Sequence, residues 1–328
     1  MSKTICVSGV TGQTASYLVE QLLAEGHKVY GLIRRSSVFN TERINHLYDN
    51  PNLKLVYGDL ADYSSILGFV GDVKPDEFYN LGAMSHVRVS FDIPEYTFDV
   101  TGTGVLRCLE AIRKVSPKTR FLQASSSELF GASPPPQNEN TPFHPRSPYA
   151  VAKLAGYWAT VNYREAYNLF ACNSITYNHE SPRRGETFVT RKITRAATRI
   201  KLGLQDKLLL GNLDAKRDWN HASDVARAMK LIMNLDFADD FVIGSGKMYS
   251  VQEFLELVFS KLDLDYKEFV EFDARLIRPA EVDALCADSS KIKIITGWEP
   301  LISFECLVDE MIECDMKLAE QERLIKEK

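Results

Sequence analysis

Two residues four positions apart, Tyr149 and Lys153, have the chemistry of a proton-transfer pair. On a helix this spacing puts both side chains on one face. A lysine ammonium beside a phenol favours the phenolate and lowers the phenol pKa from about 10 toward neutrality. A tyrosine in that state can act as a general base near neutral pH. Because most such pairs merely lie on a helix surface, the value of this one depends on the rest of the chain.

Three hydroxyls and a carboxylate follow the apolar run that begins at Arg120. Ser125, Ser126 and Ser127 are able to bond a substrate oxygen, and Glu128 supplies the carboxylate. We expect them at the carboxyl end of a strand, where ligands bind in an open α/β sheet. The residues alone support two interpretations of Glu128 equally: a base that acts on a substrate, or a carboxylate paired with a helix dipole.

A glycine-rich turn near the N-terminus predicts the nucleotide site that this chemistry needs. An apolar run at 4–8 leads into the turn at 9–15, Gly-Val-Thr-Gly-Gln-Thr-Ala, and helical periodicity runs from Ser16 to Glu25. Strand, glycine turn and helix in this order are the context of a dinucleotide site. The backbone approaches the pyrophosphate there, and the helix N-terminus stabilises its charge.

The next predicted strand, at 28–33, ends in basic and hydroxyl residues. An NAD site usually places an acidic residue at this point, to bond the ribose 2′-hydroxyl. Here the strand is followed by Arg34, Arg35, Ser36 and Ser37, which suit a 2′-phosphate better. We therefore predict NADP as the cofactor, in preference to two solvated surface arginines.

The rest of the chain alternates between strands and helices. Further strands are predicted at 53–57, 76–81, 120–124 and 169–176, and a long helix at 94–115. This order predicts an α/β fold with a Rossmann-type doubly wound parallel sheet. Asp59, at a strand end, would bond the adenine amino group or cap the next helix. Tyr96, early in the long helix, would face the cofactor.

Two regions of unequal size are predicted. Residues 1–177 would form the NADP-binding domain, which would also receive part of 219–247, and residues 178–328 would mainly form a smaller C-terminal α/β lobe for the substrate. We expect the boundaries to interleave. The charged tail after Ala319 is predicted to fray.

Composition argues against several other classes of protein. The net charge of -5 gives no reason to expect nucleic acid or an acidic membrane as partner. No apolar run reaches the roughly 18 residues of a membrane helix, and strand-like sequence begins by Thr4, so we expect no leader. The six cysteines include no Cys-x-x-Cys pair, which indicates reduced thiols and a cytoplasmic location. The histidines lack metal-ligand spacing, so no metal is predicted.

With these pieces together, the chain resembles the extended short-chain dehydrogenase/reductases and, within them, the GDP-mannose 4,6-dehydratases. The likeness covers nearly the whole length. It is densest at 34–44 (Arg-Arg-Ser-Ser-Val-Phe-Asn-Thr-Glu-Arg-Ile), 80–87 (Asn-Leu-Gly-Ala-Met-Ser-His-Val), 145–153 (Pro-Arg-Ser-Pro-Tyr-Ala-Val-Ala-Lys) and 178–192 (Asn-His-Glu-Ser-Pro-Arg-Arg-Gly-Glu-Thr-Phe-Val-Thr-Arg-Lys). The resemblance implies a lyase that converts GDP-mannose to GDP-4-keto-6-deoxymannose and water, for GDP-deoxysugar synthesis such as that of GDP-fucose.

The resemblance also implies two sets of binding residues. The NADP set is Gly9, Thr11, Gly12, Gln13, Arg34, Arg35, Ser36, Asp59, Leu60, Leu81, Ala83, Ser85, Tyr96, Tyr149, Lys153, His179 and Arg184. The GDP-sugar set is Ser85, Ser126, Glu128, Asn178, Val189, Lys192, Arg217, Arg278 and Glu281. A homodimer or homotetramer is implied as well, with the segment around Arg35 reaching a neighbouring subunit.

The implied reaction is an oxidation at C4, loss of water across C5 and C6, and reduction at C6. Tyr149 would take the C4 hydroxyl proton, Ser126 would bond that oxygen, Glu128 would act at C5 and C6, and Lys153 would hold the nicotinamide ribose. Two positions depart from the family pattern. Thr14-Ala15 replaces the usual Asp-Gly, which is expected to loosen the turn. Ser126 replaces a threonine, which keeps the hydroxyl but loses a methyl that restricts its rotamers and is expected to affect the rate.

Two alternatives remain open at this point. An NADPH-dependent 4-ketoreductase or an epimerase of a nucleotide sugar needs the serine and the Tyr/Lys pair but no base at position 128, and a ketoreductase would consume NADPH. A non-catalytic NADP-sensing protein on the same fold belongs to a different class. Such proteins typically lack the catalytic tyrosine or lysine, and both are present here.

Overall fold

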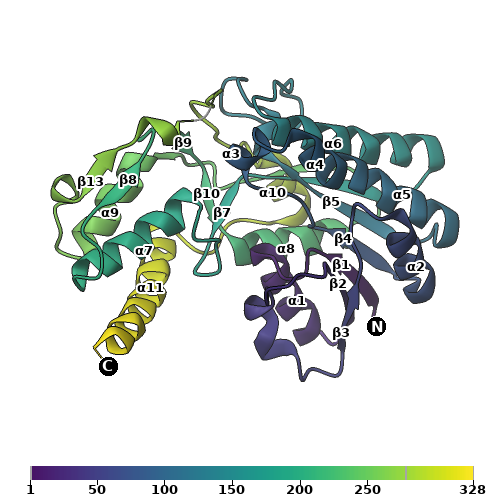
Figure 1. Ribbon diagram of the computed structural model, residues 1–328. Helices are drawn as coiled ribbons and strands as arrows, with labels where there is room; N and C mark the ends of the chain where they lie inside the picture. The colour runs from purple at the N-terminus through teal and green to yellow at the C-terminus, as the bar shows by residue number, and fades with distance from the viewer. Residues whose placement is uncertain (1, 278, 328) are drawn as a thin grey trace.

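One parallel sheet organises the larger part of the protein. The computed structural model describes residues 2–277 and 279–327, and within them seven strands pair in the order β11-β6-β5-β4-β1-β2-β3 (Figure 1). The strands are β1 (Thr4–Ser8), β2 (Lys28–Ile33), β3 (Leu53–Tyr57), β4 (Glu77–Asn80), β5 (Arg120–Ser126), β6 (Ala171–Thr176) and β11 (Asp240–Ile243). The predicted doubly wound fold is confirmed, because the strand order reverses between β1 and β4.

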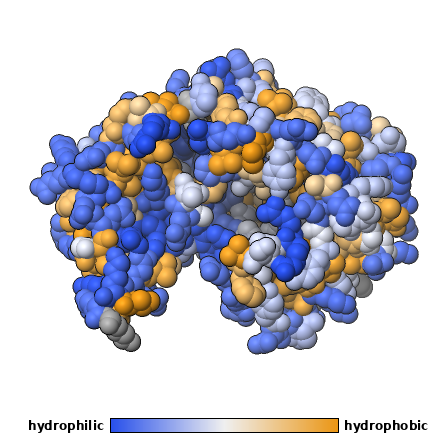
Figure 2. Space-filling model, in the orientation of Figure 1, coloured by the Kyte–Doolittle hydropathy of each residue, from blue (hydrophilic) through white to orange (hydrophobic). Residues whose placement is uncertain are grey.

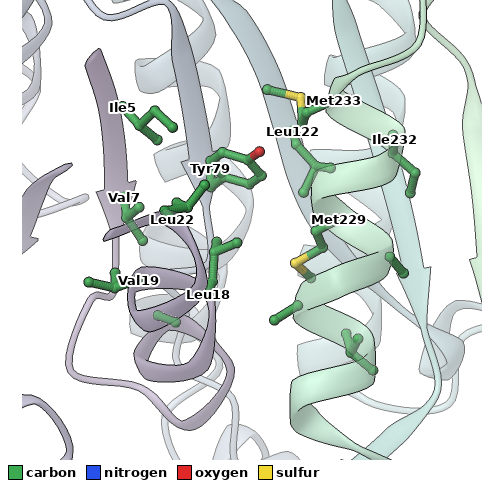
Figure 3. Packing of buried hydrophobic residues seen from close by; sticks show 14 of the residues in the cluster. Ile5, Val7, Leu18, Val19, Leu22, Tyr79, Leu122, Met229, Ile232 and Met233 are labelled. Carbon is green, nitrogen blue, oxygen red and sulfur yellow. The ribbon is translucent and has the colours of Figure 1, made fainter. Parts of the chain in front are cut away.

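Helices cover both faces of this sheet. On one face α1 (Gln13–Ala24) and α8 (Ala222–Met233) lie side by side, and Figure 3 shows their apolar side chains, among them Leu18 and Met229, directed toward one another and toward the strands. The other face is covered by α2 (Tyr63–Val73), α5 (Gly104–Val115) and α6 (Pro148–Tyr167). Covering both faces explains why the inner strands are almost wholly buried.

The helix predicted from Pro94 to Val115 changes its winding in the middle. Between α4 (Pro94–Phe98) and α5, residues Asp99–Thr103 form a π-helical turn. Gly102 in this turn lies against α6, where an added Cβ would meet the Ala152 carbonyl oxygen at 3.1 Å. The π-helical turn therefore lies where this helix comes close to α6, the helix that carries Tyr149 and Lys153.

A smaller lobe has a second apolar core. Its helices α7 (Val189–Lys201), α9 (Val251–Lys261) and α11 (Phe304–Lys326) surround the parallel pair β8 (Leu208–Leu210) and β13 (Val270–Phe272). The prediction that the chain frays after Ala319 is wrong, because α11 continues to Lys326. Arg195 and Arg199 of α7 both pair with Glu322 and hold this last part of the helix.

Short elements lie where the two parts meet. β7 (Asn178–Glu180) pairs in parallel with β10 (Trp219–His221), and β9 (Lys216–Arg217) pairs antiparallel with β12 (Tyr249–Ser250). Figure 2 shows a notch between the side with α7 and α11 and the side with α1, bordered mainly by hydrophilic residues. The remaining helical pieces are η1 (Glu42–Leu47), α3 (Val87–Ser90), η3 (Ser127–Leu129), η4 (Tyr266–Glu268), η5 (Ala274–Leu276) and α10 (Ser290–Thr296).

No helix in the described part of the chain combines the length and the apolar character needed to cross a membrane.

Candidate active site

The glycine turn lies at the carboxyl end of β1, beside the end of β4. Gly9 has φ +64°, a left-handed conformation that favours glycine, and an added Cβ would lie 2.8 Å from the Gly82 backbone. The Gly12 N–H bonds the Gly9 carbonyl oxygen at 2.8 Å, which closes the turn just before α1 begins at Gln13. Glycine backbone at a helix N-terminus, at the point where the strand order reverses, fits the pyrophosphate of a dinucleotide.

A neutral histidine ties this turn to β7. His179 Nδ1 lies 2.8 Å from the Tyr177 carbonyl oxygen, which accepts only, so Nδ1 carries the proton. Nε2, 2.7 Å from Thr14 Oγ1, therefore accepts from that hydroxyl. Burial lowers the His179 pKa to about 4, with the charge of Arg184 as the next cause. The Gln13 side chain donates to the His179 carbonyl oxygen at 2.9 Å and thereby adds a second link.

The loosening expected from Thr14 and Ala15 stays a prediction. Thr14 links the turn to β7, and the Ala15 side chain is buried in the core beneath it. Sequence reasoning missed that Thr14 joins the glycine turn to β7. In the sequence, Thr14 stood out only as a departure from the family pattern.

The four predicted catalytic side chains come together at the carboxyl end of β5. Ser126 ends the strand, and its Oγ accepts the Glu128 backbone N–H at 3.2 Å, which holds the hydroxyl in one place. Ser147 caps α6 by accepting the Ala150 N–H at 3.1 Å, so Tyr149 lies in the first turn of that helix. Ser126, Glu128, Tyr149 and Lys153 are all buried, and a hydrogen bond joins Ser126 to Tyr149.

The expected lowering of the tyrosine pKa by Lys153 is wrong for the protein alone. Burial raises the Tyr149 pKa to about 12, the Glu128 carboxylate adds to the rise, and Ser126 and Arg184 oppose it. Lys153 Nζ lies 5.9 Å from the centre of the Tyr149 ring and donates to the Ala124 carbonyl oxygen at 2.5 Å. Its own pKa is lowered to about 8 by burial.

Among the residues predicted for the adenine end, Arg34 lies beside Tyr96 and Arg35 beside Ser36. Arg34 donates to the Tyr96 hydroxyl at 2.6 Å, and the Arg35 guanidinium contacts the Ser36 carbonyl oxygen. Both arginine contacts are exposed to solvent. Asp59 accepts the Ala61 N–H at 3.0 Å within its own loop, whereas Asp62 caps α2.

The residues predicted for the nucleotide sugar lie in and beside the smaller lobe. Asn178 is in β7, and Val189 begins α7. Lys192 donates to the Leu209 carbonyl oxygen at 2.7 Å, and buried Arg217 donates to that of Lys216 at 2.9 Å. Arg278 lies outside the described residues. In the described ranges no three His, Cys, Asp or Glu side chains are grouped as metal ligands.

Comparison with known proteins identifies the family. The sequence model described as GDP-mannose 4,6 dehydratase matches residues 6–311. GDP-mannose 4,6 dehydratase 2 of Arabidopsis thaliana is 55% identical over 333 residues, which cover 98% of this chain and 89% of the plant protein. The chain belongs to the GDP-mannose 4,6-dehydratase family. The human GDP-mannose 4,6 dehydratase is 48% identical, over 95% of this chain and 91% of its own length.

Solved structures of lower identity share the fold. The dTDP-glucose 4,6-dehydratase of Bacillus anthracis, solved in complex with NAD, has a TM-score of 0.85 at 22% identity and covers 97% of this chain and 98% of its own. RMD of Pseudomonas aeruginosa, solved with NADPH, has a TM-score of 0.79 at 22% identity, with 97% and 100% covered. At this identity the likeness shows that the fold is shared and no more.

In this member of the GDP-mannose 4,6-dehydratase family, Arg43 joins the arginines of the 178–192 segment behind the glycine turn, a contact that sequence reasoning missed. Arg43 donates to the Arg183 carbonyl oxygen at 2.6 Å and to that of Thr11 at 3.3 Å. Burial lowers the Arg43 pKa, and the neighbouring charges of Arg191, Arg183 and Arg184 add to this. These contacts join the glycine turn to the loop after β7. Arg183, Arg184 and Arg191 lie in the 178–192 segment, but Arg43 is 140 positions from Arg183, so no local pattern shows that it joins them.

Proposed function

We propose that this chain converts GDP-mannose to GDP-4-keto-6-deoxymannose and water, with NADP as an internally recycled hydride carrier. The family assignment supports the reaction. The observation that carries the proposal is the buried carboxylate of Glu128 beside Ser126 and Tyr149. A ketoreductase or an epimerase has no use for a base at this position, whereas removal of the C5 proton requires one.

The proposed steps use four side chains. The nicotinamide, when bound, supplies the hydride acceptor at C4 and the hydride donor at C6. Tyr149 takes the C4 hydroxyl proton while Ser126 bonds that oxygen, and Lys153 holds the ribose. The resulting ketone acidifies the C5 hydrogen, which Glu128 removes as a proton. Glu128 then returns a proton to the departing C6 hydroxyl, so that one water leaves. C5 regains a proton as C6 is reduced, which balances the proton that Tyr149 took at C4, so no net redox occurs.

We propose that the cofactor is NADP, held by the glycine turn, Lys153, His179 and the Arg34–Ser36 segment. Arg34 and Arg35 present guanidinium donors at the end of β2, a position suited to a 2′-phosphate. The remaining contacts would come from Thr11, Gln13, Asp59, Leu60, Leu81, Ala83, Ser85, Tyr96, Tyr149 and Arg184.

Replacing Arg34 by alanine tests this choice. We expect the Kd for NADP to rise roughly tenfold, because one charge-assisted bond to a phosphate is lost at an exposed site. The Kd for NAD should stay nearly unchanged. Fluorescence titration of both cofactors measures the effect, with Arg88→Ala, which removes an exposed arginine paired with Asp92 at 2.8 Å, as the control. Equal weakening for NAD and NADP would contradict the assignment.

For GDP-mannose we propose contacts from Asn178, Val189, Lys192, Arg217, Arg278 and Glu281, with Ser85, Ser126 and Glu128 at the sugar.

We further propose a homodimer or homotetramer. Val38 and Phe39, next to Arg35, are 76% and 94% exposed, which suits a segment that reaches a second subunit. Six free cysteines fit a reducing compartment, and we propose a cytoplasmic location.

The deciding experiment is incubation of the purified protein with GDP-mannose and no added reductant. The expected result is loss of one water from the sugar nucleotide by mass spectrometry, at constant absorbance of reduced nicotinamide. Net consumption of added NADPH with formation of a 4-hydroxy product would indicate a ketoreductase. NADP binding with no change in any nucleotide sugar would instead support the non-catalytic class.

A further inference from the structure

The loop after β7 carries a charge that acts on two active-site residues. Arg184 is one of the groups that lower the pKa of Tyr149 and of His179. Its guanidinium lies 3.0 Å from Glu180 and 3.7 Å from the centre of the Phe188 ring. The position of residues 181–185 therefore affects both the proposed base and the histidine of β7 that bonds the glycine turn.

A single buried guanidinium holds the backbone of this loop from behind. Arg191, in the first turn of α7, is 5% exposed. Its Nη1 donates to the carbonyl oxygens of Pro182 and Arg184, the latter at 3.1 Å. Two carbonyls of the loop thus depend on one side chain, whose fixed planar fork sets their spacing.

The opposite edge of that guanidinium is held by the C-terminal helix. Arg191 Nε lies 2.8 Å and 2.9 Å from the two Asp315 oxygens, and Nη2 lies 2.7 Å from Oδ1. Thr194 donates to Asp315 Oδ2 at 2.6 Å. Asp315 is fully buried on α11, which runs alongside α7 (Figure 1). A buried carboxylate with such partners fixes the guanidinium rather than merely neutralising it.

We propose that Asp315 and Arg191 are positioning residues for the reaction: through them α11 holds the 181–185 loop, and so places Arg184 opposite Tyr149 and His179. This inference rests on the proposed function. The alternative is a purely structural ion pair. The apolar face of α11, with Leu307, Val308 and Met311, also packs in the core of the smaller lobe. Loss of the pair should therefore release the loop without releasing the helix.

The test is Asp315→Asn, with Asp309→Asn as its control. Asp309 lies on the same helix, is 58% exposed and pairs with Lys261 at 2.6 Å, away from the loop. Trypsin under native conditions reports on the loop, because Arg183 and Arg184 are cleavage sites within it. We expect Asp315→Asn to be cut after these residues at least about ten times faster than the wild type and the control, at a temperature well below the melting transition of every variant.

The pH dependence of kcat/KM is a second readout, which loss of a purely structural ion pair would leave unchanged. The charged groups that face Tyr149 are Glu128 from η3, Arg184 from the loop and Lys153 from α6. Displacing the Arg184 cation raises the pKa of the base, so the limb of kcat/KM that rises with pH should move to higher pH in Asp315→Asn. KM for GDP-mannose should change less than kcat.

The outcomes distinguish a positioning role of the Arg191–Asp315 pair from a purely structural one. If Asp315→Asn resists trypsin as the wild type does and keeps its pH profile, the positioning role is overturned. If that variant does not melt cooperatively, Arg191→Lys, which keeps the charge but lacks the fork, takes its place with the same expected results. If the wild type leaves GDP-mannose intact, the proposed function fails, while the trypsin comparison still decides whether the pair holds the loop.

Discussion

Replacing Glu128 by glutamine should stop the loss of water while oxidation at C4 continues. The amide keeps the shape of the side chain and cannot take the C5 proton. We expect turnover of GDP-mannose to fall roughly 100- to 10,000-fold, the range for loss of a general base. Because Tyr149 and Ser126 remain, reduced nicotinamide should accumulate on the enzyme. Its near-ultraviolet absorbance in a single turnover measures this step separately from product formation.

The same substitution has a predictable effect on pH dependence. The Glu128 carboxylate is one of the groups that raise the Tyr149 pKa, so the neutral amide should lower it. A base with a lower pKa is deprotonated at lower pH, and C4 oxidation in the variant should therefore extend to lower pH than in the wild type. Glu139→Gln is the matched control, since Glu139 bonds the Val242 N–H at the sheet edge, away from the site. Dehydration at the wild-type rate in Glu128→Gln would assign the base to another residue.

Replacing Tyr149 by phenylalanine should block the reaction one step earlier. Without the phenol no group takes the C4 hydroxyl proton, so neither reduced nicotinamide nor dehydrated product should form. We expect a loss of at least about a hundredfold in kcat. NADP should still bind with little change, because the ring that packs in the site is retained. Rapid-scan absorbance after mixing with GDP-mannose checks the first point, and cofactor titration the second.

The control for this experiment lies two turns along the same helix. Tyr157 is buried and donates to Asp240 at 3.0 Å, so Tyr157→Phe also removes a hydrogen-bonded phenol from α6. Its loss should lower the stability by about 1 kcal/mol and leave the chemistry intact. If Tyr149→Phe formed reduced nicotinamide at the rate of Tyr157→Phe, another group would be the base.

Much of the site follows from local rules. The four-residue spacing places Tyr149 and Lys153 on one helix face, and Ser126 and Glu128 follow a strand whose end must lie at the ligand edge. The pKa of Tyr149 did not follow from these rules. The sequence shows an ammonium near a phenol, whereas the structure shows that burial dominates and that Lys153 Nζ bonds a backbone carbonyl.

Contacts between distant segments could not be predicted either. The Thr14–His179 bond joins residues 165 positions apart, and the Arg191–Asp315 pair spans 124. Strands of two or three residues such as β7 and β9 are too short for periodicity to reveal. The charged end of α11 resembles a fraying tail in sequence, because its partners Arg195 and Arg199 lie on another helix.

The place of α8 and β11 in the sheet has a consequence for synthesis of the chain. β11 pairs with β6 and α8 packs against α1, yet both are made only after the ribosome has completed α7 and β8. Until then the nascent chain carries an unpaired edge on β6 and half of an apolar layer. Such non-local pairing slows folding and leaves an intermediate prone to aggregation. We therefore expect fragments that end before β11 to require chaperones, although the nucleotide turn within them is complete.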